Sequence, residues 1–176
     1  MFTHRSFIRH MVPGILLLMS VMSVCAENIT MPRGWRAPTD TELNDAWRNK
    51  DPGKYSVARG DFNGDGVEDV AMMLVSFQRH EVGLFVFLAR KNRSYEAIRL
   101  NVIENTNYLQ VMGVAKVSPG SYKTACGKGY WDCTPSETPV LSLKQDAIDF
   151  FKMESANSYF YWDVKKSSFQ QMWMSD

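Results

Sequence analysis

Apolar residues fall into short stretches along most of the chain, and polar turns separate these stretches. After the N-terminal 26 residues the most apolar run is residues 70–77, interrupted only by Ser76, which is typical of a central strand buried on both faces. Between residues 98 and 102 apolar and polar positions alternate, which indicates a half-buried strand. The pattern predicts seven to eight short strands in an antiparallel meander, drawn from residues 70–77, 84–89, 98–102, 108–117, 140–143, 148–153, 159–162 and 169–174.

A single helix is expected before these strands. Thr39 and Glu42 have the spacing of a capping box, in which each side chain bonds the backbone N–H of the other residue. The apolar residues that follow fall on one helical face, namely Leu43, Ala46 and Trp47. The sequence therefore predicts a helix over residues 40–49 that covers one face of the sheet.

The predicted fold class is α+β, with one short N-terminal helix packed on a mostly antiparallel twisted sheet. The sequence Asp51-Pro52-Gly53 ends the helix. Residues 27–38 contain prolines and glycine without periodicity, so they are expected to form an extended leader segment with Trp35 as its anchor. Residues 39–176 then form a single domain, which is long enough to bury a core.

The N-terminus has the pattern of a secretory signal peptide. Arg5 and Arg9 give it a positive start, and an apolar run follows over residues 14–24. Val24 and Ala26 occupy the −3 and −1 positions of an A-x-A-like cleavage site, which predicts cleavage after Ala26 and a signal peptide over residues 1–26. The apolar run is shorter than the roughly 20 residues of a membrane-spanning helix. We therefore expect a periplasmic or secreted protein without a membrane span.

Cleavage also changes the charge and the cysteine content. It removes two arginines and no acidic residue, so the formal net charge moves from +1 to −1. Nothing in this balance suggests nucleic-acid binding, which would need a basic face. An alternative reading of the leader is a lipoprotein signal with Cys25 as the acylated residue. Val24 is bulkier than the residue that usually precedes such a cysteine, so a lipid anchor is not expected.

Two cysteines remain after cleavage, Cys126 and Cys133. In an oxidising compartment they are expected to form a disulfide. Closing so short a loop stabilises a fold by about 2.5 kcal/mol on the chain-entropy model. The alternatives are two free thiols or a pair of metal ligands.

Oxygen-bearing side chains recur at alternate positions between residues 61 and 69. Asp61, Asn63 and Asp65 supply oxygens at positions 1, 3 and 5, Val67 a backbone carbonyl at position 7, and Asp69 a carboxylate at position 9. Calcium binds six to eight such hard oxygens. The spacing therefore predicts a calcium site that stabilises the folded chain, because tightly packed carboxylates repel one another without a cation.

This segment is not an EF-hand, because position 12 is Met72 rather than a bidentate glutamate. The pattern D-F-N-G-D-G-x-x-D followed by an apolar run, over residues 57–77, resembles the calcium loops of FG-GAP and VCBS repeats, as in integrin-like propeller blades. The resemblance implies a structural calcium ion that holds two strands together. Blades of that family come in sets, whereas this nonamer occurs once. The alternative is a plain turn, since Asn-Gly and Asp-Gly are strong hairpin signals.

The segment from residue 122 to residue 134 is a candidate partner-binding loop. It combines Tyr122, Lys128, Tyr130 and Trp131 with the predicted disulfide. Aromatic and charged groups on a rigid loop are typical of protein-binding hot spots. The alternative is that the aromatic rings fold back onto the sheet.

Other candidate sites have weaker support. His80 is the single histidine after cleavage, which excludes zinc sites with several histidine ligands and indicates a solvated turn residue. Met172 and Met174 offer thioethers to a soft metal such as Cu(I), but their alternation also suits core filling. Three acidic residues form a candidate set for glycoside hydrolysis, namely Asp146, Asp149 and Glu154.

The sequence thus favours an exported, calcium-stabilised interaction protein without enzymatic activity. An inhibitor or immunity-type partner of another envelope or secreted protein is its more specific form. The alternative is a periplasmic hydrolase that acts on cell-wall or sugar substrates through aspartate and glutamate residues.

Overall fold

The buried strand at the centre of the chain is the starting point of the fold. The computed structural model describes residues 29–48, 53–92 and 94–176. All eight residues of β2 (Asp69–Ser76) are buried, which confirms the prediction of a strand covered on both faces. The predicted signal peptide, its cleavage site and Cys25 lie outside the described residues, as do positions 49–52 at the end of the predicted helix.

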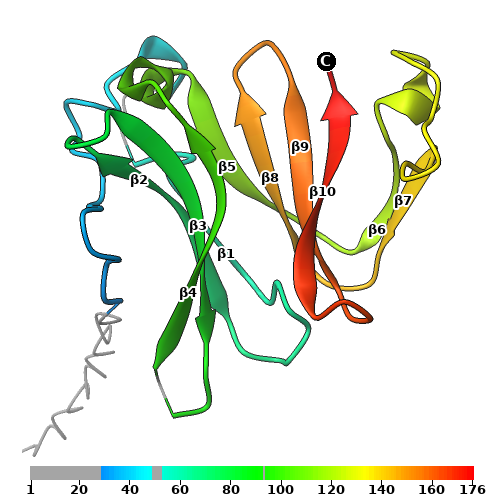
Figure 1. Ribbon diagram of the computed structural model, residues 1–176, viewed down its shortest axis with the longest axis horizontal. Coiled ribbons are helices and arrows are strands. Elements are labelled where there is room, and N and C mark those ends of the chain that lie inside the picture. Colours follow the sequence, from blue (N-terminus) through cyan, green and yellow to red (C-terminus); the bar gives the residue numbers. More distant parts are fainter. Residues whose placement is uncertain (1–28, 49–52, 93) are drawn as a thin grey trace, which may run out of the picture.

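Two four-stranded antiparallel sheets make up most of the molecule (Figure 1). In the first sheet β2 and β3 (Glu81–Ala89) lie between two outer strands, β1 (Val57–Gly60) and β4 (Tyr95–Ile103). The second sheet has the order β10-β9-β8-β5 and contains β5 (Met112–Val117), β8 (Ala147–Lys152), β9 (Asn157–Asp163) and β10 (Ser168–Ser175). The order puts β10 at one edge of the second sheet.

A third sheet, here called the ribbon, consists of β6 (Gly120–Lys123) and β7 (Val140–Leu143). Figure 1 shows the ribbon beyond β10, on the side away from the first sheet. The described chain also has three 3-10 segments, η1 (Ala46–Arg48), η2 (Thr106–Gln110) and η3 (Cys126–Lys128). The single meander predicted from the sequence is therefore wrong. The chain leaves the second sheet after β5, forms the separate ribbon of β6 and β7, and returns to pair β8 with β5.

The main core lies between the two four-stranded sheets. Met73 and Val86 from the first sheet meet Val114, Phe150 and Phe160 from the second in one buried cluster. The sheets approach each other where the backbone N–H of Val114 on β5 donates to the carbonyl of Tyr55, just before β1, at 2.7 Å. Burial of these apolar faces is the dominant stabilising contribution.

Each sheet also buries part of its outer face. On the first sheet, Trp35 packs edge-on against Phe85 with ring centroids 4.9 Å apart. Arg36 and Val75 bond each other through both backbone groups, so the extended leader is anchored at Trp35 as expected. On the second sheet, the ribbon covers an apolar cluster whose β10 members are Met172 and Met174. Both thioethers fill this core, which is the structural role that their alternation suits.

The predicted helix is wrong for the part of it that the structure describes. Thr39 and Glu42 do form the reciprocal bonds of a capping box, at 2.7 and 3.4 Å. Yet the chain continues as turns and the three residues of η1, and the described residues contain no α-helix. The fold is therefore mostly β rather than α+β.

Tertiary contacts of Arg48 explain this outcome. Its fully buried guanidinium donates to the backbone carbonyls of Lys54, Leu109 (3.2 Å) and Met112 (2.6 Å). A helix this short is only marginally stable in isolation. Packing of Leu43 in the main core and the buried bonds of Arg48 therefore determine the backbone conformation of residues 40–48.

Candidate functional site

The acidic loop joins β1 to β2 and is anchored by Phe62. This ring has no exposed surface and belongs to the main core. Asp61 and Asn63 flank it in the sequence, and both are half-buried at the surface. Burial of the central phenylalanine therefore turns its polar neighbours toward solvent, where a cation has access.

The carboxylate of Asp61 organises the turn. Its Oδ1 atom accepts the backbone N–H groups of Gly64 at 2.8 Å and Asp65 at 3.0 Å. Its Oδ2 atom accepts the N–H of Gly66 at 2.9 Å. One side chain thus orders three consecutive residues of the loop.

Asn63 and Asp65 repeat this bonding on a smaller scale. Oδ1 of Asn63 accepts from the N–H of Asp65 at 3.0 Å, and Oδ1 of Asp65 accepts from the N–H of Val67 at 2.9 Å. Gly64 and Gly66 have φ values of 78° and 82°, which side-chain-bearing residues rarely adopt. The two glycines therefore allow the tight curvature that brings the oxygens onto one turn.

The donor chemistry of this turn fits a hard cation. Asp61, Asn63 and Asp65 carry carboxylate and amide oxygens, which calcium prefers, and Val67 adds a backbone carbonyl. Among the described residues, no group of three or more His, Cys, Asp and Glu side chains is placed to hold a metal ion. A calcium ion here would therefore depend on two carboxylates, an amide and backbone oxygens.

Asp69 lies apart from that turn and connects the acidic loop to β3 through hydrogen bonds. It has no exposed surface, and its oxygens accept the backbone N–H groups of Phe62 at 3.0 Å and Ala89 at 2.8 Å. Burial raises the pKa of this carboxyl to about 6, against the opposing effect of the two backbone bonds. Asp69 thus ties the loop to the end of β3, a role that the sequence pattern does not reveal. Its role as a calcium ligand stays a prediction.

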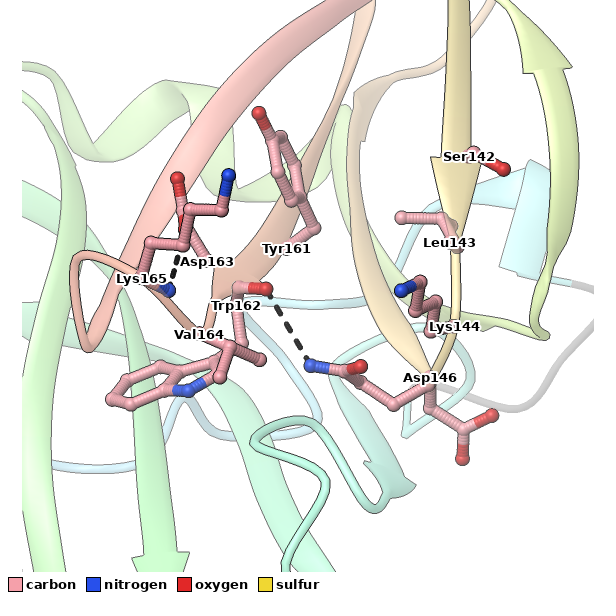
Figure 2. A pocket seen from close by; sticks show the side chains of 10 residues that line it. Ser142, Leu143, Lys144, Asp146, Tyr161, Trp162, Asp163, Val164 and Lys165 are labelled. Atoms are coloured by element: carbon pink, nitrogen blue, oxygen red, sulfur yellow. Dashed lines mark hydrogen bonds between the residues drawn. The ribbon is translucent and has the colours of Figure 1, made fainter.

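A shallow cavity of about 350 Å³ lies between the β7–β8 and β9–β10 turns, and its lining includes Gln145 and Asp146, which contact the acidic loop (Figure 2). Gln145 donates to the carbonyl of Trp162 at 3.4 Å and lies against Gly64 of the loop. Asp146 accepts the backbone N–H of Asp61 at 3.2 Å and lies 3.7 Å from the ammonium of Lys116. The β7–β8 turn therefore supports the acidic loop directly.

The disulfide predicted from the sequence is present. Cys126 and Cys133 are bonded, and they close the loop that follows β6. The loop is also fastened to the edge of β10, because the backbone N–H of Ala125 donates to the carbonyl of Trp173 at 2.9 Å. The backbone bond places the loop beside β10, and the disulfide closes it.

The four predicted partner-binding residues divide into two pairs. Tyr122 lies in β6, where its ring packs edge-on against Tyr159 and its hydroxyl donates to the carbonyl of Ser118 at 2.8 Å. Lys128 donates to the carbonyl of Met174 at 2.6 Å. These two side chains therefore help to hold the fold.

Tyr130 and Trp131 lie at the surface of the same loop. Tyr130 is 54% exposed, and Trp131 is half-buried with its ring 6.5 Å from that of Tyr130. The indole N–H of Trp131 donates to Glu137 at 3.0 Å, which sets the orientation of the ring. The two aromatic residues therefore form one surface patch in which the orientation of the Trp131 ring is set.

Glu137 was missed by sequence reasoning, although a signal for it exists. Thr134 and Glu137 have the same T-x-x-E spacing as Thr39 and Glu42. Glu137 accepts the backbone N–H and the hydroxyl of Thr134 at 3.0 and 2.9 Å. The backbone bond from Thr134 and the bond from Trp131 lower the pKa of Glu137. Its carboxylate thus orders the loop that carries the aromatic pair.

The three candidate catalytic carboxylates have separate surroundings. Asp146 supports the acidic loop, as described above. Asp149 on β8 borders a different cavity, of about 460 Å³, and accepts a bond from Asn157 at 2.9 Å. Burial raises the pKa of Asp149 to about 6. Glu154 is exposed in the β8–β9 turn, and His80 is exposed in the β2–β3 turn as expected.

Comparisons with known proteins add no relative to this picture. No helix among the described residues is both long enough and apolar enough to span a membrane. The chain matches no protein-family model, no curated protein and no solved structure.

Proposed function

We propose that this chain is an exported interaction protein that binds a protein partner in the periplasm or outside the cell. The surface formed by Tyr130 and Trp131 is its contact site, and an inhibitor or immunity-type role is the specific form of the proposal. The observation that carries it is an aromatic pair, with Tyr130 exposed and Trp131 half-buried, on a loop fastened by the disulfide and by the bond from Ala125 to Trp173.

Rigidity is what makes this surface suited to binding. Aromatic rings bury a large contact area with few rotatable bonds, so ordering them costs little entropy. The bond from Trp131 to Glu137 already fixes one of the two rings before any partner arrives. Preorganisation of this kind increases affinity, because less conformational freedom is lost on binding.

Calcium has a structural role in the proposal. The resemblance of the acidic loop to FG-GAP and VCBS loops, together with the oxygen donors of Asp61, Asn63 and Asp65, supports a cation that stiffens the connection between β1 and β2. Outside its own strands, the loop contacts Gln145 and Asp146 of the β7–β8 turn. Calcium therefore stabilises the fold and takes no part in partner contact.

The separation of Asp146, Asp149 and Glu154 supports a binding protein over the alternative hydrolase. Glycoside hydrolysis needs two carboxyl groups that face one substrate. Here Asp146 is engaged with the acidic loop, Asp149 with Asn157, and Glu154 with solvent. Each of these carboxyl groups has a different neighbourhood.

Affinity capture with matched variants tests the proposal. Tagged mature protein is used on envelope and secreted fractions, together with Tyr130→Ala and Val164→Ala variants. Val164 is a fitting control, because it is 72% exposed and lies in the β9–β10 turn. We expect one specific protein to be captured by the wild-type and Val164→Ala proteins and lost with Tyr130→Ala. Equal capture by all three proteins would show that the aromatic surface is not the contact site.

A further inference from the structure

The outer edge of β10 exposes backbone hydrogen-bonding groups. The bond from the N–H of Lys152 to the carbonyl of Ala156, at 2.9 Å, fixes which residues of β9 bond to β8. In an antiparallel pair of strands, every second residue bonds to the neighbouring strand. Counting from Ala156 in the β8–β9 register, Ser158 and Phe160 bond to β8. The residues between and after them, Tyr159 and Tyr161, therefore bond to β10 on the other side.

The same alternation continues into β10. Tyr159 pairs with Met172 and Tyr161 with Gln170. The backbone groups of Phe169, Gln171 and Trp173 therefore point away from β9. The bond that the carbonyl of Trp173 accepts from Ala125 agrees with this direction.

The outward-pointing groups differ in how they are satisfied. The carbonyl of Trp173 accepts from Ala125, and the carbonyl of Phe169 accepts from the side chain of Gln170 at 2.9 Å. Within residues 29–48, 53–92 and 94–176, nothing bonds to the outward N–H or carbonyl of Gln171. Proteins usually cover or blunt such an edge. At Gln171 the edge is open on both its donor and its acceptor.

Cavities lie on both sides of this open edge, and both include Gln171 and Trp173 in their lining. One, of about 540 Å³, lies toward the disulfide loop and is lined there by Trp131, Ser136 and Glu137. The other, of about 290 Å³, lies toward the end of the main core and is lined there by residues that include Ile103, Met112 and Phe150. Side chains of an added strand alternate between the two faces of a sheet. The two cavities are thus placed to receive alternate side chains.

We propose that an extended segment of the partner protein adds to the second sheet as a new strand along β10 at Gln171. This inference rests on the proposed function and names its partner chemistry: main-chain hydrogen bonds supply affinity, and alternate side chains supply specificity. The segment has apolar side chains toward Ile103 and Phe150, and polar ones toward Ser136 and Glu137. Trp131 then lies at the junction of the aromatic surface and the added strand.

A backbone-specific substitution tests the proposal. Gln171→Pro removes the outward N–H, and proline is tolerated in an edge strand when its position faces away from the neighbouring strand. Gln171→Ala removes the same side chain and keeps the N–H. The probe is a displayed library of random decapeptides selected on the wild-type mature protein, with affinities of the selected peptides measured by fluorescence polarisation.

We expect selected peptides with alternating apolar and polar residues, whose Kd rises at least tenfold with Gln171→Pro and less than threefold with Gln171→Ala. N-methylation of successive peptide residues on the wild-type protein is a second measurement, which does not depend on the folding of the proline variant. Affinity losses at alternate residues support strand addition.

Three results would overturn the proposal: no enriched peptides, equal affinity for the proline variant, or losses without alternation. A dimer in sedimentation that Gln171→Pro abolishes would instead assign the edge to a second copy of this chain. The peptide assay needs no natural partner, so its failure is distinct from a failure of the Tyr130→Ala capture experiment.

Discussion

Replacing Asp61 with alanine separates the two roles of the acidic loop. The change removes the acceptor of three backbone N–H groups, those of Gly64, Asp65 and Gly66. Each such bond contributes about 0.5–1.5 kcal/mol net, and water replaces part of this at an exposed turn. We therefore expect a loss of about 2 kcal/mol in the free energy of unfolding without calcium.

We expect bound calcium to add a second contribution in the wild-type protein. A ligand present at 100 times its Kd stabilises the folded state by about 2.7 kcal/mol. The wild-type protein should therefore be more stable in calcium than in EGTA. The Asp61→Ala variant should lose most of this difference, so its total loss in calcium reaches about 4–5 kcal/mol.

Urea unfolding of the mature protein measures both contributions. Wild-type, Asp61→Ala and Glu68→Ala proteins are compared in excess calcium and in EGTA. Glu68 is a matched control from the same loop, because its side chain is 60% exposed and lies off the alternating ligand positions. Its removal should change stability by less than about 0.5 kcal/mol and leave the calcium difference intact.

Three outcomes would contradict this reasoning. A wild-type protein with the same stability in calcium and EGTA would refute the calcium assignment. A calcium difference that survives in Asp61→Ala would show that Asp61 is not a ligand. Unchanged stability of that variant in EGTA would refute the role of the carboxylate in ordering the turn.

Two further substitutions test buried polar groups. Arg48→Met leaves three backbone carbonyls without their donor, and it also removes the cost of a buried charge. We expect the free energy of unfolding in urea to fall by about 2–4 kcal/mol. An unchanged midpoint would refute the role of Arg48. Asp149 has a pKa raised to about 6 by burial, so the folded state binds its proton more tightly than the unfolded state, where the pKa is near 3.8. Its ionisation therefore lowers stability as pH rises from about 4 to about 6. The stability of Asp149→Asn relative to the wild-type protein should increase across this range and level off above it, and a difference independent of pH would contradict the assignment.

Features that depend on neighbours in the sequence could be predicted. Residues 70–77 are apolar without alternation, and β2 is buried on both faces. Cys126 and Cys133 lie close in the sequence, and their pairing needs little more than an oxidising compartment. The bonds between Thr39 and Glu42 also form as their spacing predicts. In each case the interaction is local, so spacing alone brings the groups together.

The helix predicted over residues 40–49 shows that local sequence patterns do not suffice to predict this segment. The same capping bonds that predict a helix at Thr39 are followed by turns, and a second T-x-x-E sequence at Thr134 also bonds without starting a helix. Capping contributes about 1 kcal/mol, which is less than burial of Leu43 and the bonds of Arg48 contribute together. Contacts with distant residues therefore determine the local backbone.

The sequence by itself determined the central strands, the disulfide and the oxygen-bearing turn at Asp61, because short-range spacing specifies each of them. Only the tertiary structure decided that Asp69 is bonded to Ala89, that Lys128 is bonded to Met174, and that no other described residue covers the outer edge of β10 at Gln171. These features join segments far apart in the chain. Their geometry follows from sheet order and packing, which no local pattern of residues encodes.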